Sequence, residues 1–278
     1  MALDKETIKR ICDYVYKEPR TVLDIAKHID RNWKTAERYV NQIIDEQGTL
    51  KIKTFRGGTR GALKIVTWNN LEKINSTEFQ EKLFRKIESG RKKHDFSPMD
   101  IYQYVDEEKR DAFINHSDKS FGKDFVALLK KAKTEILCFS GNLSWVNYKD
   151  KDILISDIIE ELLKRGVKFK IVSRVDLAST SNIDRIIDIQ NKLGVDSIEI
   201  RHSEQPLRGF IIDNEVASLK EVKNPEDYKP GELDEKARIY YQIYDKDWIL
   251  WMQKVFYNLF RHSIDHKKRL NDIRSIKA

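Results

Sequence analysis

The stretch TVLDIAKHIDRNWKTAERYVNQIIDEQGTLKIKTFRGGTRGALKIVTW, residues 21–68, decides the fold of the first part of this chain. Thr21 is suited to cap a helix, because its hydroxyl can accept a hydrogen bond from the first turn. The apolar residues after it recur at helical spacing up to Ile29. A polar break follows, and a further helix is predicted from about Trp33 to Glu46, ended by Gly48.

After Gly48 the apolar residues alternate, which predicts two half-buried strands over residues 50–55 and 63–68. Between them lies RGGTRG, residues 56–61, whose glycines allow a tight turn. An amphipathic helix over residues 3–16, stopped by Pro19, precedes this stretch. Three helices followed by a hairpin are typical of a winged helix-turn-helix.

The solvent side of the helix over residues 33–46 carries side chains of the types that read base edges or hold phosphates. The hairpin tip adds two arginines that suit phosphates or a narrow minor groove. Together these residues predict a surface for double-stranded DNA: Trp33, Lys34, Thr35, Arg38, Asn41, Arg56 and Arg60. Among them, Arg38 and Asn41 are the best candidates for base contact.

The charge distribution agrees with that interpretation. Residues 1 to 68 hold 14 Lys and Arg against 9 Asp and Glu, a surplus of +5 within the +7 of the whole chain. A small helical domain with a hairpin also serves as a protein-binding module, and lysines on a helix often only line a solvated face. The agreement of helix order, polar break, hairpin and charge favours DNA.

With 278 residues the chain has room for two domains. We expect the DNA-binding domain over residues 1–70, a helical connector over residues 71–97, and an α/β domain over residues 98–278. The apolar stripe of the connector fits packing on a partner or on its own copy, or closing the core of the first domain.

Composition excludes several classes of protein. The two cysteines, Cys12 and Cys138, provide neither a disulfide framework nor a zinc spacing, so no metal site or cofactor is expected. No apolar run approaches the length of a membrane span, and the N-terminus lacks the apolar core of a signal peptide. We therefore expect no membrane partner and a cytoplasmic, nucleoid-associated protein.

From Phe96 onward helical and strand patterns alternate, which predicts a largely parallel sheet. A hairpin turning at Asn214 and a last strand over residues 238–244 follow, and a long helix over residues 248–268 covers the sheet. The expected fold class is therefore a two-domain α+β or α/β protein.

Ligands of open α/β sheets gather where the strands end. Three loops follow predicted strands here and should converge, and their side chains suit a small anionic or sugar-like effector: Ser140, Asn142, Arg174, His202, Gln205, Arg208 and Asp213. Structural roles stay open for two of them. Asp213 fits a cap of the turn at Asn214, and Arg208 fits an ion pair with Asp213 across the sheet.

The segment RHSEQPLRGFIIDNEVAS, residues 201–218, together with the domain order, resembles archaeal TrmB-type transcription regulators, which join a winged helix-turn-helix to a phospholipase D-like domain. Phospholipase D-like enzymes use a His, Lys and Asp motif with the histidine as nucleophile. The matching positions are Pro206, Arg208 and Asp213. The resemblance therefore implies that the phospholipase D-like domain lacks the nucleophile and serves ligand sensing or dimerisation. It also implies a homodimer.

The sequence leads to three hypotheses. The first is a dimeric, sequence-specific transcription regulator that binds double-stranded DNA. The second is an architectural, chromatin-like protein that coats DNA with little sequence preference. The third is a nuclease whose nucleophile has moved to His202.

Overall fold

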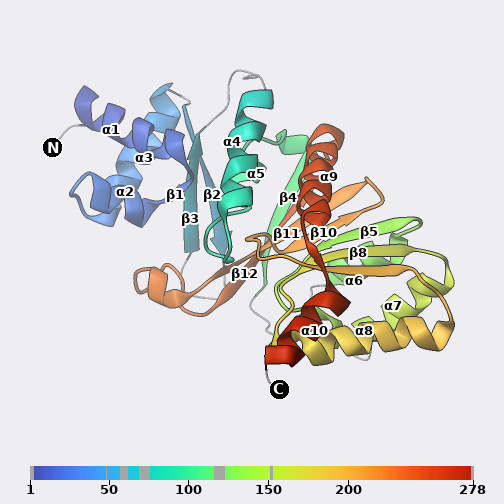
Figure 1. Ribbon diagram of the computed structural model, residues 1–278. Coiled ribbons are helices and arrows are strands. Elements are labelled where there is room, and N and C mark those ends of the chain that lie inside the picture. Colours follow the sequence, from blue (N-terminus) through green and yellow to red (C-terminus); the bar gives the residue numbers. More distant parts are fainter. Residues whose placement is uncertain are drawn as a thin grey trace.

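The computed structural model describes residues 3–47, 49–56, 62–68, 76–115, 123–150 and 153–276. Its N-terminal unit has the element order predicted from the sequence, three helices followed by a hairpin (Figure 1). A short strand before the second helix pairs with the second hairpin strand. The elements are α1 (Lys5–Lys17), β1 (Arg20–Thr21), α2 (Val22–His28), α3 (Trp33–Gln47), β2 (Leu50–Arg56) and β3 (Ala62–Trp68).

Local hydrogen bonds explain where these helices begin. The Asp4 carboxylate accepts the Thr7 backbone N–H at 2.8 Å at the start of α1. Thr21 and Asp24 form a reciprocal capping box at the start of α2. The Asn32 side chain accepts the Thr35 N–H at 2.9 Å and so begins α3 directly after the polar break.

The hairpin of the N-terminal unit is packed on both faces. Val66 belongs to the core of the three helices, whereas Leu63 and Ile65 belong to a core shared with the rest of the chain. The Phe55 ring contacts the Tyr241 ring edge-to-face with centroids 6.4 Å apart. The hairpin strands thus fix the N-terminal unit on the second unit.

The second unit is built on one eight-stranded mixed sheet, in the order β13-β9-β8-β5-β10-β11-β12-β4. Among the described strands of this sheet, the parallel neighbours are β5 with β8 and β8 with β9. The strands are β4 (Arg110–Asn115), β5 (Glu135–Phe139), β8 (Lys168–Ser173), β9 (Ile198–His202), β10 (Gly209–Ile212), β11 (Val216–Lys223), β12 (Ala237–Ile243) and β13 (Ile264–Asp265). Two very short strands, β6 (Lys149–Asp150) and β7 (Ile153–Leu154), form a separate pair.

Helices cover both faces of this sheet (Figure 1). One face carries α6 (Lys123–Lys131), α7 (Ile155–Lys164) and α8 (Thr180–Leu193), and the other carries α4 (Ser76–Ser89), α5 (Met99–Tyr102) and α9 (Lys246–Arg261). Strand β5 shows the division, because Ile136 and Cys138 point into the first core and Leu137 and Phe139 into the second. The α+β fold class expected from the sequence is confirmed.

Two expectations about the second unit are wrong. The sheet is not largely parallel, because the β10–β11 hairpin returns beside β5 and starts an antiparallel run that ends at the unpredicted strand β4. The long helix over residues 248–268 is also interrupted. Between α9 and α10 (His266–Ile276) the chain forms β13, which pairs Ile264 with His202 at the edge of β9.

The connector helix α4 packs on α9 of its own chain and contributes Leu83 and Ile87 to the shared core. In the last turn of α4, the Lys86 ammonium lies 2.6 Å from the buried Asp100 carboxylate and 3.5 Å from that of Glu18. This network joins α1, α4 and α5. Within the described ranges, no helix has the length and apolar character that crossing a membrane requires.

Candidate functional site

The outer surface of α3 holds the first group of predicted functional side chains. Lys34, Arg38 and Asn41 are exposed, and their spacing of four and three residues places them on one helix face. Trp33 is 38% exposed at the first position of the helix, and Thr35 is half-buried beside it. The sequence-predicted face is therefore open to a partner.

Two neighbours shape that surface. The Arg38 guanidinium lies 5.3 Å from the centroid of the Tyr39 ring, which is a cation–π contact. Glu37, the acidic residue among these positions, forms an ion pair with Lys64 of β3. The acidic charge is thus turned toward the hairpin. Arg60 and the Arg56 side chain lie outside the described residues.

The second group of predicted residues converges on a cavity at the carboxyl end of β5 and β8. A cavity of about 350 Å³ is lined by four of them, Ser140, Asn142, Arg174 and Arg208. A neighbouring cavity of about 270 Å³ shares Ser140, Arg174 and Arg208 and adds Gln205. The three predicted loops therefore meet, and we call the two adjoining spaces the basic cavity.

Backbone contacts hold these loops together. The Ser140 N–H donates to the Val172 carbonyl at 2.9 Å, and the Arg174 N–H donates to the Gly141 carbonyl at 2.9 Å. The Gln205 amide donates through Nε2 to the Ser140 carbonyl at 3.0 Å. Each loop is thus pinned to the end of β5.

The Arg208 guanidinium is fixed by its own segment. Its Nη1 donates to the carbonyls of Gln205 at 2.9 Å and Leu207 at 2.6 Å. Gly141 makes room for the group, because a Cβ at that position would lie 2.9 Å from the Arg208 Nε. A side chain directly after Ser140 would therefore displace the Arg208 guanidinium from this position.

The cavity concentrates positive charge in a buried place. Burial and, to a smaller extent, the nearby Arg174 charge lower the pKa of Arg208 to about 10. Burial lowers the pKa of Lys220 to about 8, and the Arg208 and Lys93 charges act in the same direction. Both groups remain cationic at neutral pH, and the Arg208 charge disfavours the charged form of Lys220. An anion placed between them would relieve this repulsion.

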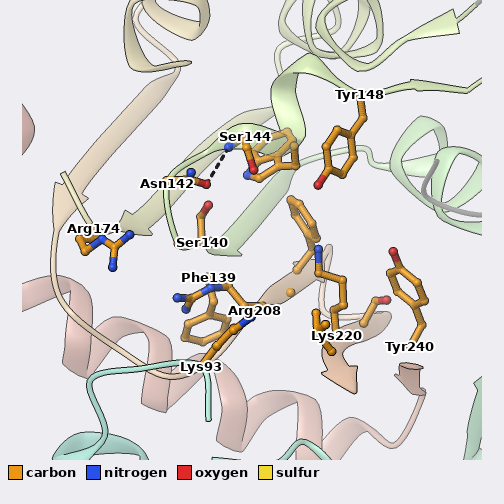
Figure 2. A pocket seen from close by; sticks show the side chains of 16 residues that line it. Lys93, Phe139, Ser140, Asn142, Ser144, Tyr148, Arg174, Arg208, Lys220 and Tyr240 are labelled. Carbon is orange, nitrogen blue, oxygen red and sulfur yellow. Dashed lines mark hydrogen bonds between the residues drawn. The ribbon is translucent and has the colours of Figure 1, made fainter. Parts of the chain in front are cut away.

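The remaining walls are aromatic or carry hydroxyl groups. In Figure 2 the Lys220 amino group and the hydroxyls of Tyr148 and Tyr240 point into the same space. Ser140 and Ser144 line the same cavity, and no acidic side chain lines it among the described residues. Such a lining binds an anion with donors and a ring with its apolar walls.

Two of the predicted site residues do not belong to this cavity. His202 lines neither space, and its Nδ1 accepts the Val175 N–H at 2.9 Å, so it holds the loop after β8 in place. The grouping of Asp213 with the others is wrong. Its carboxylate lies at the start of β5, where it accepts the N–H groups of Thr134 at 2.8 Å and Glu135 at 2.9 Å. The antiparallel pairing of β10 with β5 carries Asp213 to the opposite end from Arg208.

Sequence reasoning missed several lining residues that the tertiary structure brings in. They come from the connector, from the 3-10 turn η2 (Ser144–Asn147) and its end, and from β11 and β12: Lys93, Ser144, Tyr148, Lys220 and Tyr240. The position of Lys220 within a strand could have indicated it. This lysine follows buried Leu219 and shares a strand face with Ser218 and Val222, and that face lines the cavity.

The part of the chain that the structure describes contains no group of three or more His, Cys, Asp or Glu side chains that could hold a metal ion. No protein-family model matches the chain, and no curated protein matches it by sequence.

Solved structures with a similar chain path exist. TrmBL2, described as an archaeal chromatin protein with a novel mode of DNA binding, is 18% identical and has a TM-score of 0.41, covering 95% of this chain and 94% of its own. Nuc from Salmonella typhimurium, a phospholipase D family member, is 15% identical with a TM-score of 0.39, covering 56% of this chain and 98% of its own. NucT from Helicobacter pylori is 14% identical with a TM-score of 0.40, over 56% of this chain and 98% of its own. Likenesses at this level assign neither a family nor an activity to the chain.

Proposed function

We propose that the protein is a dimeric transcription regulator that binds double-stranded DNA in a sequence-specific way through its N-terminal winged helix-turn-helix. The observation that carries this proposal is the open face of α3 with Lys34, Arg38 and Asn41 in line. An exposed helix face of this composition fits the major groove, where arginine pairs with guanine and asparagine with adenine.

In this proposal the α/β unit senses a ligand and forms the dimer. A twofold dimer presents two α3 helices, which suits a palindromic operator with half-sites one or more helical turns apart. A ligand acts on DNA binding only if it favours one arrangement of the two units over another.

Binding rather than catalysis is proposed for the basic cavity. Pro206, which stands where the resemblance expects a nucleophile, is buried and packs against Gly90. His202, the alternative nucleophile, is turned to the Val175 N–H. Plasmid DNA incubated with the wild type and with His202→Ala should stay intact in both cases. Cleavage by the wild type that the substitution removes would make the protein a nuclease.

The second candidate function is architectural coating of DNA, which the surplus of +7 over the whole chain favours. Selection from a random DNA library followed by footprinting decides between the two. A discrete protected site that survives competitor DNA supports the regulator. Protection that grows with the length of any duplex supports the architectural protein.

A further inference from the structure

The connector reaches the basic cavity directly. Lys93, four residues after α4, lines both of its spaces, and Arg91 and Lys92 line the smaller one. Hydrogen bonds stabilise the turn that carries them, because the Asp95 carboxylate accepts the N–H groups of Arg91 and Lys92, each at 2.8 Å. One wall of the cavity therefore belongs to the segment that joins the two units.

Gly90 lets this turn approach the loop between β9 and β10 closely. A Cβ at Gly90 would lie 2.8 Å from the Pro206 ring, so the connector backbone touches the segment that carries Arg208. A ligand that moves Lys93 toward Arg208 and Lys220 would therefore also change the contact between Gly90 and Pro206. Burial lowers the pKa of Lys93, and the charges of Lys236 and Arg208 lower it further, so these cations repel one another.

Size and charge select the class of ligand. Among the described residues, Glu204 is the one acidic side chain that lines the two spaces. Six cationic side chains line them: Arg91, Lys92, Lys93, Arg174, Arg208 and Lys220. Spaces of about 350 and 270 Å³ suit a small molecule and cannot admit a DNA duplex. Several cations on one small ligand call for a group with more than one negative charge, such as a phosphate monoester.

A buried acceptor adds a second requirement. Gln205 is 2% exposed and lines the smaller space, and among the described residues its Oε1 has no hydrogen-bond partner. The amide cannot be reversed, because its Nε2 already donates to the Ser140 carbonyl. A ligand hydroxyl would donate to this oxygen and remove the cost of a buried unpaired acceptor.

We propose that the basic cavity binds a phosphate monoester of a hydroxylated compound, and that the contact of this ligand with Lys93 couples the cavity to the N-terminal unit. The coupling rests on the proposed DNA-binding function, whereas the ligand site does not. The route is short, because the connector continues from Asp95 into Phe96 and Met99, which share a core with Leu63 and Ile65 of the hairpin.

Calorimetric titration of the full chain tests the ligand site without DNA. Glucose 6-phosphate and adenosine monophosphate are the ester probes, with inorganic phosphate and neutral glucose beside them. At least one ester should bind more tightly than inorganic phosphate, and glucose should not bind. Lys220→Met should abolish ester binding, while Lys168→Met, at an exposed lysine of β8, should leave it unchanged. Glucose binding as tightly as its phosphate, or neither ester binding more tightly than inorganic phosphate, would overturn the site.

DNA binding measured with and without saturating ester tests the coupling. The affinity of the wild type should change about fivefold or more, the usual range for linked sites. In Lys93→Met the ester should change DNA affinity much less, even at concentrations that saturate the variant. An unchanged DNA affinity in the wild type, with the ester shown to be bound, overturns the coupling. If no DNA binds with or without ester, the DNA-binding function fails while the calorimetry still decides the site.

Discussion

The α3 surface and the basic cavity both carry lysine and arginine side chains, but these side chains differ in their exposure to water. Lys34 and Arg38 stand in water, where a charge costs little and is available to a partner of any size. Arg208 and Lys220 are withdrawn from water in one cavity, and burial lowers the pKa of both groups. The difference teaches that exposed cations suit a polymer met at the surface, whereas buried cations are kept at a cost in stability and suit a small enclosed anion.

The largest effect is expected on the exposed side. Arg38→Ala should weaken binding to the preferred DNA sequence by about tenfold to a hundredfold, because a base contact of arginine contributes roughly 1 to 3 kcal/mol. Thermal stability should not change, since the side chain is exposed. Gel-shift titrations with preferred and random duplexes measure this, with the exposed Lys82→Ala of α4 as the matched control. Equal losses on both duplexes would show that α3 reads no bases.

A half-buried charge with partners sharpens the comparison. Asp213→Asn should lower the free energy of unfolding by about 1 to 2 kcal/mol, because the carboxylate accepts several N–H groups at the start of β5. Burial opposes the charge, but hydrogen bonds from Thr134 and the backbone bring a net lowering of the pKa of Asp213. A lowered pKa stabilises the fold above the unfolded value near pH 4, and this gain is lost as the pH falls through the folded value. Urea unfolding at pH 7 and pH 3 should show the difference shrinking at the lower pH.

A buried charge among like charges should behave in the opposite way. Lys220→Met should raise the free energy of unfolding by about 1 kcal/mol at pH 7, because it removes a buried cation and keeps its volume. Folding lowers the pKa of Lys220 to about 8, so between pH 8 and the ordinary lysine value the unfolded chain binds more protons. The wild type therefore gains stability as the pH rises through that window, and the advantage of the variant should fade. A variant less stable than the wild type at pH 7 would contradict the account of a destabilising charge.

The smallest effect is expected for a phosphate contact. Lys34→Ala should weaken binding to all duplexes by a few-fold and lower the slope of log affinity against log salt by about 1. A series of gel shifts at increasing salt concentration measures it. A change confined to one sequence would move Lys34 from holding phosphates to reading bases.

Much of the fold could be predicted because its signals are local. Capping residues such as Thr21 and Asn32 and the change from helical to alternating spacing near Gly48 all lie within a few residues of the structure they determine. The broken C-terminal helix could not be predicted in this way. Its interruption depends on the pairing of Ile264 with His202, a partner 62 positions earlier in the chain.

The candidate site residues could likewise be predicted where they depend on local sequence, and not where they depend on distant parts of the chain. The face of α3 follows from helical spacing, so Lys34, Arg38 and Asn41 could be identified from the sequence. Ser140, Arg174 and Arg208 could be grouped because parallel strands end at a common edge. Asp213 was misplaced, because the antiparallel return of β10 reverses which end of the strand meets that edge.

The sequence by itself determined the helices and strands, the charged face of α3 and the loops that follow the strands, because each depends on neighbours in the chain. Only the tertiary structure decided that Lys93 of the connector, Lys220 of β11 and Arg208 share one cavity. Spacing along the chain carries no information about which cations are buried together. That requires the packing of the connector turn on Pro206, which brings Lys93 to the cavity.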